Sequence, residues 1–258
     1  METNKIYQGD CLELMKQIED KSIDLILCDL PYGTTACKWD TIIPFEPLWE
    51  QYKRIIKDNG AIVLTASQPF TSALVMSNIK MFKYELIWEK EKMTNFMLVK
   101  KQFGKIHENI CVFYKQQPVY NPQKVPVSQN KIDKRKNFNQ VIKKDGVIPE
   151  MIGGHFNKDD GTRYPDSVLY FARERTSLHP TQKPVALFEY LIKTYTNEGD
   201  LVLDNCVGSG TTAIACIKTN RRFIGMELEQ KYVDIANKRI GEVKQEAMQS
   251  EARNSSQP

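Results

Sequence analysis

The chain has 258 residues, of which 41% are hydrophobic and 26% are charged, and its net charge is +4. This composition indicates a globular protein with a sizeable core, built as one large domain or as one domain with an insertion. The first residues are polar and no apolar run approaches the ~18 residues of a membrane helix, so we expect a cytoplasmic protein without a signal peptide or membrane span. Six cysteines without a CxxC pair indicate reduced thiols, and three scattered histidines predict no metal site.

Short apolar runs alternate with helical patterns over residues 1–115. Strands are expected at 5–7, 23–28, 61–66, 84–88 and 109–114. Helices are expected from residue 10, at 45–58 and at 68–78. Because strand–helix–strand units favour parallel strands, this alternation predicts an α/β fold with a mostly parallel sheet.

Two helix ends carry local signals. Asp10, with Glu13 three residues later, resembles a capping box and predicts a helix N-cap. Its carboxylate or the nearby backbone can also lie beside a ligand at the end of an edge strand, and the two roles are compatible. Asn59-Gly60 is typical of a helix that ends with a residue in the left-handed backbone conformation, so we expect the helix at 45–58 to stop there.

Residues 116–178 show no sustained periodicity and are rich in Asn, Gln, Pro, Gly and Lys. A structureless loop of this length is unusual in a compact domain, so we expect an inserted module. A solvated charged surface is one interpretation. Aromatic side chains among the charges favour a phosphate-binding surface instead, and these are Tyr120, Phe138, Phe156 and Tyr164. The basic residues expected to bind there are Lys131, Lys134, Arg135, Lys136, Lys143 and Lys144.

Regular patterns return after residue 178. The run His179–Pro184 precedes a helix, and the last fifteen residues are polar. Further strands are expected at 201–203 and 222–226, and further helices at 212–218 and 230–243. The predicted divisions are a first half at 1–115, the insertion at 116–178, a second half at 179–243 and a flexible tail at 244–258.

Two stretches follow apolar strands and contain residues suited to ligand binding. Asp29-Leu30-Pro31-Tyr32 is one, because open α/β sheets bind ligands at such strand ends. In the other, Gly208-Ser209-Gly210 lets backbone approach a ligand at a helix N-terminus. With Glu227 seventeen residues after Gly210, this stretch also matches a nicotinamide-binding pattern. Asp204, directly ahead of the glycines, suits a ligand with an ammonium group, and the Asp29 stretch has no evident role in hydride transfer.

Taken together, these stretches resemble the amino-group DNA methyltransferases that use S-adenosylmethionine. The order resembles the family's β group, in which the catalytic motif precedes the cofactor motif. The family's Asp-Pro-Pro-Tyr corresponds to Asp29–Tyr32, with Leu30 in place of proline. The family's Asp-Pro-Phe-x-Gly-Ser-Gly-Thr-Thr corresponds to Asp204–Thr212, with Asn205 and Cys206 in place of proline and phenylalanine. Further matching segments are Gly9-Asp10, His179–Pro184 and Phe223–Glu227.

The resemblance implies a Rossmann-like methyltransferase fold, circularly permuted, with helices flanking the sheet and with 116–178 as the variable target-recognition region. The catalytic residues that it implies are Asp29, Leu30, Pro31 and Tyr32. The cofactor-binding residues that it implies are Asp10, Cys11, Asp29, Lys183, Asp204, Asn205, Cys206, Gly208, Ser209, Gly210, Thr211, Thr212 and Glu227. Lys183 is equally well explained as a solvated helix start.

An adenine N6 amine is a poor nucleophile because its lone pair is delocalised into the ring. Two acceptors aimed at its N–H bonds favour a tetrahedral nitrogen, and the resemblance assigns them to the Asp29 carboxylate and the Leu30 carbonyl. Pro31 holds Leu30 extended, and Tyr32 would stack on the flipped-out base. Asp29 either takes the amine proton during transfer or the proton leaves afterwards.

The function expected from the resemblance is therefore site-specific methylation of adenine N6 in double-stranded DNA, since the catalytic motif begins with aspartate. The alternatives are a cytosine-N4 enzyme, an enzyme acting on RNA or another amine, and a non-catalytic DNA-binding homologue. A homodimer and a cognate restriction endonuclease are the other partners that the family suggests. Residues 88–90 and 94–96 are expected to line the target-base side or to form an ordinary surface loop.

Overall fold

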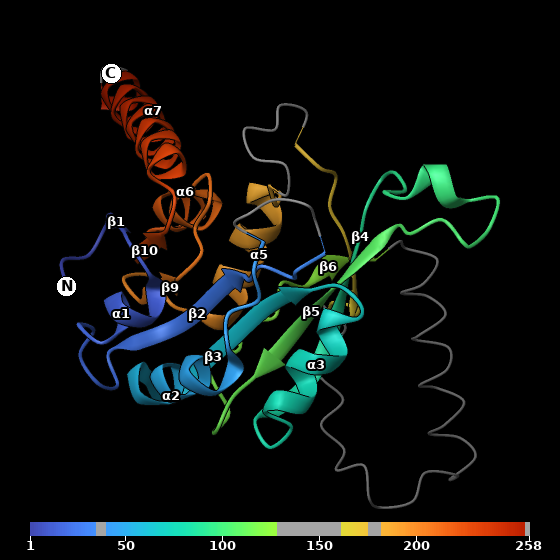
Figure 1. Ribbon diagram of the computed structural model, residues 1–258. Helices are drawn as coiled ribbons and strands as arrows, with labels where there is room; N and C mark the ends of the chain where they lie inside the picture. The colour runs from blue at the N-terminus through green and yellow to red at the C-terminus, as the bar shows by residue number, and fades with distance from the viewer. Residues whose placement is uncertain (35–39, 128–160, 175–181, 256–258) are drawn as a thin grey trace, which may run out of the picture. The chain divides into compact units, whose positions relative to one another are not determined.

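The computed structural model describes residues 1–34, 40–127, 161–174 and 182–255. The chain divides into two compact units, one formed by Met1–Asn121 with Ser167–Pro258 and the other by Pro122–Asp166. Within the described residues, the first unit holds an eight-stranded sheet with helices on both faces (Figure 1). The described part of the second unit pairs two short antiparallel strands, β6 (Val125–Pro126) and β7 (Thr162–Arg163).

The sheet of the first unit is mostly parallel, as predicted. Its strands are β1 (Lys5–Gln8), β2 (Ile23–Asp29), β3 (Ile56–Ala66), β4 (Phe82–Glu89), β5 (His107–Phe113), β8 (Val168–Tyr170), β9 (Leu201–Asp204) and β10 (Arg222–Glu227). They lie in the order β1-β10-β9-β2-β3-β5-β4-β8, and only the pairs that include β5 are antiparallel. After β2 the chain continues to β3, on one side of the β9–β2 pair, and after β9 it continues to β10, on the other side. The carboxyl ends of these two neighbouring strands therefore form the topological switch point, where open sheets bind ligands.

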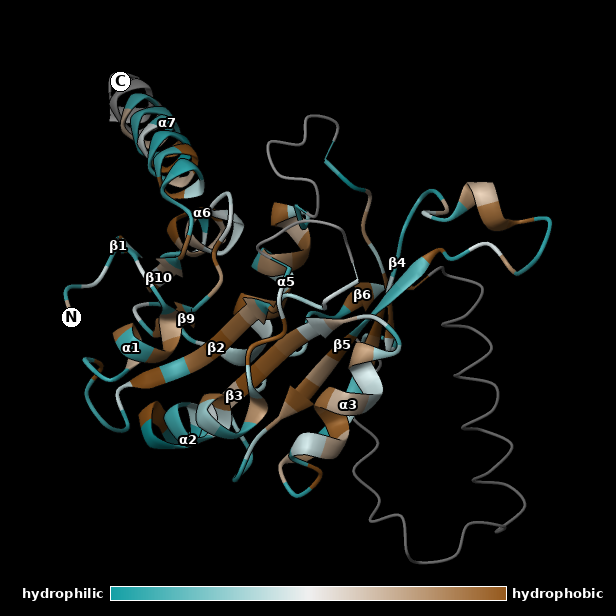
Figure 2. Ribbon diagram, viewed as in Figure 1, coloured by the Kyte–Doolittle hydropathy of each residue, from teal (hydrophilic) through white to brown (hydrophobic). Residues whose placement is uncertain are grey.

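Helices cover both faces of this sheet (Figure 1). One face carries α1 (Cys11–Met15), α2 (Phe45–Ile55) and α3 (Phe70–Ser77), and the other carries α5 (Val185–Tyr195), α6 (Thr211–Lys218) and α7 (Gln230–Ser255). Along β2, Ile26 and Cys28 face the first set, whereas Leu25 and Leu27 face the second. Figure 2 shows the resulting apolar colour of the central strands, which is the pattern of a sheet buried on both faces.

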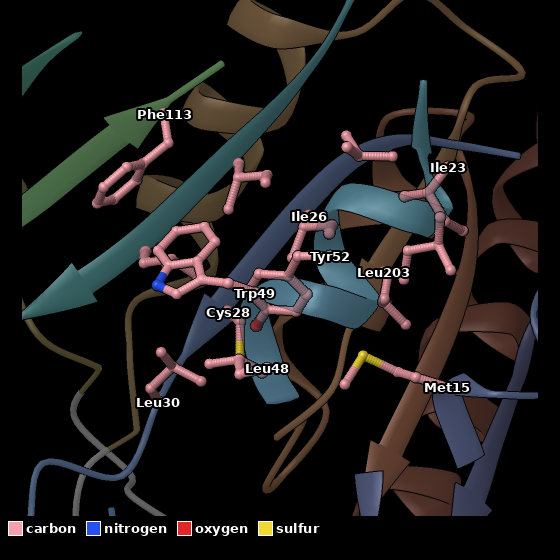
Figure 3. Close-up of a cluster of buried hydrophobic side chains, with 14 of the residues drawn as sticks. Met15, Ile23, Ile26, Cys28, Leu30, Leu48, Trp49, Tyr52, Phe113 and Leu203 are labelled. Atoms are coloured by element: carbon pink, nitrogen blue, oxygen red, sulfur yellow. The ribbon is translucent and has the colours of Figure 1, made fainter. Parts of the chain in front are cut away.

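The amphipathic helix α2 positions part of the ligand-binding edge. Figure 3 shows Leu48, Trp49 and Tyr52 of α2 lying beside Ile26 and Cys28 of β2. The three α2 side chains are buried and spaced at helical intervals. Tyr52 is fully buried yet ends in a hydroxyl, so it requires a polar partner, which the loop after β9 supplies.

Three expectations about segment boundaries need correction. Helix α2 ends at Ile55 rather than near Asp58, because Ile56 is extended (ψ 137°) and pairs with Ile23. Gly60 accordingly lies inside β3, where an added Cβ would come 2.9 Å from the Asp24 carbonyl oxygen. Sheet pairing therefore outweighs the local Asn-Gly stop signal.

The other two corrections concern the insertion and the tail. Residues 167–174 lie in the first unit because β8 pairs with β4, so the second unit spans 122–166 rather than 116–178. Helix α7 continues to Ser255, so most of the residues expected to form a tail after 243 extend this helix. Within the described ranges, no helix is both long and apolar enough to cross a membrane.

Candidate active site

A pocket of about 610 Å³ opens where β1, β2, β9 and β10 end. Because these strands are parallel, residues distant in sequence reach the same edge of the sheet. The predicted site residues that line it are Asp10, Cys11, Asp29, Leu30, Pro31, Tyr32, Lys183, Asp204, Asn205, Cys206, Gly208, Ser209, Thr211 and Glu227. Gly210 and Thr212 are not part of this lining.

Asp29 is surrounded by hydrogen-bond donors. Its Oδ1 accepts from the hydroxyl of Tyr32 at 2.7 Å and from the hydroxyl of Thr65. Thr65 is the β3 residue in register with Asp29, so the parallel pairing of β2 and β3 places the two side chains together. Asp29 Oδ2 accepts from the Lys183 ammonium at 2.5 Å. The carboxylate is therefore held in one orientation at the pocket wall.

Tyr32 is held by its hydroxyl and by its ring. The ring stacks on Phe70 of α3 with centroids 5.2 Å apart, and Lys183 Nζ lies 5.5 Å from the ring centre. Burial, together with the charges of Asp29 and Glu108, raises the pKa of Tyr32 well above its usual range. Its hydroxyl is therefore a neutral donor to Asp29.

The backbone before Pro31 is fixed by the core, and the backbone after Tyr32 is fixed by a contact with Asp40. The side chain of Leu30 is buried in the core cluster. Asp40 accepts the backbone N–H of Gly33 at 2.8 Å and of Thr34 at 2.9 Å, which anchors the chain just after Tyr32. Sequence reasoning missed Asp40, although an aspartate in a loop after a strand is a frequent acceptor for turn amides.

Lys183 belongs to a buried chain of alternating charges. Its side chain is 4% exposed, and its Nζ lies 2.5 Å from Asp29 Oδ2 and 3.4 Å from Glu108 Oε2. Lys90 forms an ion pair with the other oxygen of Glu108. With two lysines and two carboxylates, the group is neutral overall. The interpretation of Lys183 as a solvated helix start is therefore wrong.

The pKa shifts in this group follow from burial and charge pairing. Burial alone would lower the pKa of Lys183, but the carboxylates of Asp29 and Glu108 outweigh it and raise that pKa. Burial would likewise raise the pKa of Glu108, but Lys183 and Lys90 outweigh it and lower that pKa. For Lys90 burial prevails over the attraction of Glu108, and its pKa is lowered. Lys183 and Glu108 consequently stay charged near neutral pH.

Glu108 reaches the pocket because β5 runs against the other strands. The beginning of β5 therefore lies at the edge where its neighbours end. Sequence reasoning missed Glu108, since its placement depends on strand direction. The available signal was a polar pair, His107-Glu108, directly before an apolar run.

The glycine loop after β9 is held by neutral donors. Asp204 is buried and accepts the Cys206 N–H at 3.0 Å and the Thr212 hydroxyl. Burial raises the pKa of Asp204 to about 6. Glu227 accepts the Gly208 N–H at 2.9 Å, and burial raises the pKa of this carboxyl as well.

Gly210 is required for packing. Its φ of +88° is in the left-handed region, and a Cβ there would lie 3.0 Å from the Cβ of Ala236 in α7. The glycine lets α6 begin close to α7. Thr212 does not line the pocket either, but its hydroxyl donates a hydrogen bond to Asp204, which does.

Asn205 and the neighbouring thiols form the part of the pocket next to α1. Asn205 accepts from the Tyr52 hydroxyl at 2.5 Å, and its amide lies 3.6 Å from Cys11 Sγ and 3.5 Å from Cys206 Sγ. The hydrogen bond to Cys206 and burial raise the pKa of Cys11, so its thiol is neutral. Asp10 accepts the Leu12 N–H at 2.7 Å, which confirms the predicted N-cap. Among the described residues, no group of His, Cys, Asp or Glu side chains is arranged to hold a metal ion.

The predicted DNA-contacting residues are only partly described. Of the residues expected to line the target-base side, Trp88, Lys90 and Thr94 line the pocket, and a contact with the base stays a prediction. The six basic residues predicted to bind phosphate lie at 131–144, outside the described residues. Their role stays a prediction.

Comparison with known proteins agrees with this geometry. A family model described as DNA methylase (N6_N4_Mtase) matches residues 23–238. The type II methyltransferase M1.MboII of Moraxella bovis is 28% identical over 92% of this chain and 96% of its own length. The DNA adenine methyltransferase YhdJ of Escherichia coli is 29% identical over 93% of this chain and 83% of its own length.

A solved structure shows the same likeness in three dimensions. The complex of M1.HpyAVI with SAM is 26% identical, with a TM-score of 0.60, over 91% of this chain and 98% of that one. The fold, the pocket at the switch point and the family match over most of the chain lead to one conclusion: this protein belongs to the DNA methylase family.

Proposed function

We propose that the protein is a site-specific DNA methyltransferase that moves a methyl group from S-adenosylmethionine to the N6 amine of a flipped-out adenine in double-stranded DNA. The observation that carries this proposal is that Asp29–Tyr32 and the glycine loop line the same pocket. One stretch is suited to holding an amine and the other to holding a cofactor.

The lining fits S-adenosylmethionine. Glu227, at the end of β10, offers a carboxylate to ribose hydroxyls, and Asp204 offers one to an ammonium group. Gly208 removes side-chain bulk from the same wall. Asp10 and Cys11 line the pocket as well, and we propose that they receive the adenine ring of the cofactor. When bound, the cofactor supplies an electrophilic methyl group on a sulfonium.

Asp29 and Leu30 orient the target amine. The Asp29 carboxylate accepts one N–H of the amine, and the Leu30 carbonyl accepts the other, which favours a tetrahedral nitrogen with a directed lone pair. Because the Leu30 side chain is buried in the core, leucine can replace the family's proline without changing the backbone acceptor. Tyr32, supported by Phe70, provides an aromatic surface for the base, worth ~1–3 kcal/mol on the general stacking scale.

A loop beside the pocket supports duplex DNA as the substrate. Residues 90–106 join β4 to β5 and include the short 3-10 helix η1 (Phe96–Leu98). Met97 is 83% exposed and Phe103 is 98% exposed. Besides Lys90, which is paired with Glu108, this loop contains Lys92, Lys100, Lys101 and Lys105. Lysines suit phosphates, and exposed apolar side chains can enter an opened base step, so we propose that this loop contacts DNA. Recognition of the target sequence is a separate proposal, which we assign to the second unit.

Adenine is the proposed base because aspartate begins the catalytic motif, and cytosine N4 is the second candidate because the family includes both reactions. A homodimer and a cognate restriction endonuclease are further proposals drawn from the family resemblance.

Nucleoside mass spectrometry tests this proposal. The purified protein is incubated with methyl-labelled S-adenosylmethionine and unmethylated duplex DNA, and the DNA is digested to nucleosides. We expect labelled N6-methyladenine. Labelled N4-methylcytosine would keep the fold and mechanism but overturn the choice of base. No label in DNA would overturn the proposed function, and thermal shifts with S-adenosylmethionine and with NAD would then show which cofactor class the pocket takes.

A further inference from the structure

One oxygen of Glu108 lies within ion-pair distance of Lys183 but accepts no hydrogen bond from the described residues. Its Oε2 is buried and makes no hydrogen bond among the described residues, whereas Oε1 is paired with Lys90. The Nζ of Lys183 lies 3.4 Å from this oxygen. That ammonium is instead 2.5 Å from Asp29 Oδ2. A buried, unsatisfied carboxylate oxygen is unfavourable, so its position beside Lys183 calls for a functional explanation.

Asp29 differs from Glu108 in that both of its carboxylate oxygens accept hydrogen bonds. Oδ1 accepts the hydroxyls of Tyr32 and Thr65, and Oδ2 accepts Lys183. A target amine that is to donate a hydrogen bond to Asp29 must displace one of these donors. Lys183 has a second carboxylate within reach, Glu108, whereas the second acceptor of the Tyr32 hydroxyl is the uncharged Thr65 Oγ1 at 3.1 Å.

We propose that Lys183 occupies two positions, moving from Asp29 to Glu108 when the target amine binds, and that Glu108 is the positioning residue that makes this exchange possible. This inference rests on the proposed function, since the amine is its trigger. The ammonium needs to move only roughly half an ångström to reach the usual length of a charge-assisted hydrogen bond to Glu108.

The exchange leaves the group of two lysines and two carboxylates neutral overall and leaves each of its donors with an acceptor. Before it, Lys183 neutralises Asp29 while Lys90 neutralises Glu108. After it, Glu108 carries both lysines, one on each oxygen, and Asp29 accepts the amine. The flexible four-carbon stem of lysine suits such a movement better than the rigid fork of arginine would.

The test is a pair of variants compared in single-turnover methyl transfer. In Glu108→Gln, the second position loses its charge and Lys183 stays on Asp29, so we expect transfer to slow at least tenfold with unchanged Kd values for S-adenosylmethionine and DNA. In Glu108→Gln with Lys183→Met, the blocking cation is gone and the group is again neutral. We expect this double variant to transfer faster than Glu108→Gln alone.

A matched control is Asp58→Asn. Asp58 also lies between two lysines, with Lys21 at 3.1 Å and Lys115 at 3.3 Å, but its side chain is 51% exposed and lies outside the pocket lining. This variant should transfer at the wild-type rate. If Glu108→Gln does not fold, Glu108→Asp replaces it, because aspartate keeps the charge but shortens the reach, and Lys183→Met should again raise its rate.

Two results would overturn the two-position lysine. One is wild-type transfer by Glu108→Gln. The other is a double variant no faster than Glu108→Gln, which would mean that the charges serve only to hold the fold. Failure of the proposed function looks different, because the wild-type protein itself would then transfer no methyl group to DNA.

Discussion

Asp29 and Asp204 end neighbouring strands and line the same pocket, yet they are held in different ways. Asp29 is paired with a full positive charge, Lys183, which is itself linked to Glu108 and Lys90. Asp204 is held by a backbone N–H and the hydroxyl of Thr212. On the proposed function, charge pairing fixes the carboxylate that acts on a neutral amine, whereas burial with neutral donors leaves a carboxylate whose missing counter-charge a cationic ligand can supply.

Asp29→Asn should have the largest effect. Removing the charged acceptor should slow methyl transfer about 10²- to 10³-fold, because the amine is no longer oriented and polarised. Single-turnover transfer of a labelled methyl group measures this loss. Asp24→Asn is the control, since Asp24 is a lysine-paired carboxylate on the same strand but lies outside the pocket lining. Equal losses in the two variants would contradict the special role of Asp29.

Asp204→Asn should weaken cofactor binding by about tenfold or more, since a hydrogen bond to a charged group contributes about 1.5–3 kcal/mol and 1.4 kcal/mol is tenfold in affinity. In the wild-type protein, burial raises the pKa of Asp204 to about 6, so below that pH the folded protein carries a neutral side chain there. Affinity for S-adenosylmethionine should therefore fall roughly tenfold per pH unit below pH 6 and level off above it.

Calorimetric titrations between pH 5 and 8 would show this slope in the wild type and its loss in Asp204→Asn. Asp200→Asn is the control, because Asp200 directly precedes the same strand, lies outside the pocket lining and accepts the Asn197 N–H. This variant should keep both the wild-type affinity and its pH dependence. A wild-type affinity independent of pH would contradict the assignment of Asp204 to the ammonium group.

Gly210→Ala should reduce stability by about 1–3 kcal/mol or more, because alanine is strained at φ +88° and its Cβ would press on Ala236. Gly199→Ala is the matched control: its φ is +82°, but a Cβ there meets nothing within 4 Å. Chemical denaturation should show a larger loss for Gly210→Ala. Equal losses would mean that backbone strain alone accounts for the glycine.

Phe103→Ala should have the smallest effect on the folded protein. The side chain is almost fully exposed, so stability should change by less than about 0.5 kcal/mol. The Kd for duplex DNA should rise severalfold, and a mismatch opposite the target base should restore part of the affinity, because less energy is then needed to open the duplex. Unchanged duplex binding would exclude this loop from the DNA contact.

The comparison between Asp29 and Asp204 also shows what sequence could and could not predict. Both acids lie in short local motifs that follow apolar strands, so their stretches and the mostly parallel sheet were recognisable from the sequence. Thr65 and Glu108 were not, because the first depends on strand register and the second on the reversed direction of β5. At Gly60 a local helix-stop signal was overridden by strand pairing.

One measurement tests the division of roles between these two acids most directly: single-turnover transfer by Asp29→Asn and Asp204→Asn over rising concentrations of S-adenosylmethionine. We predict that Asp204→Asn approaches the wild-type rate at saturation, because its defect is in cofactor binding, whereas Asp29→Asn stays slow at every concentration. Recovery of Asp29→Asn at saturation, or a persistently slow Asp204→Asn, would contradict the account.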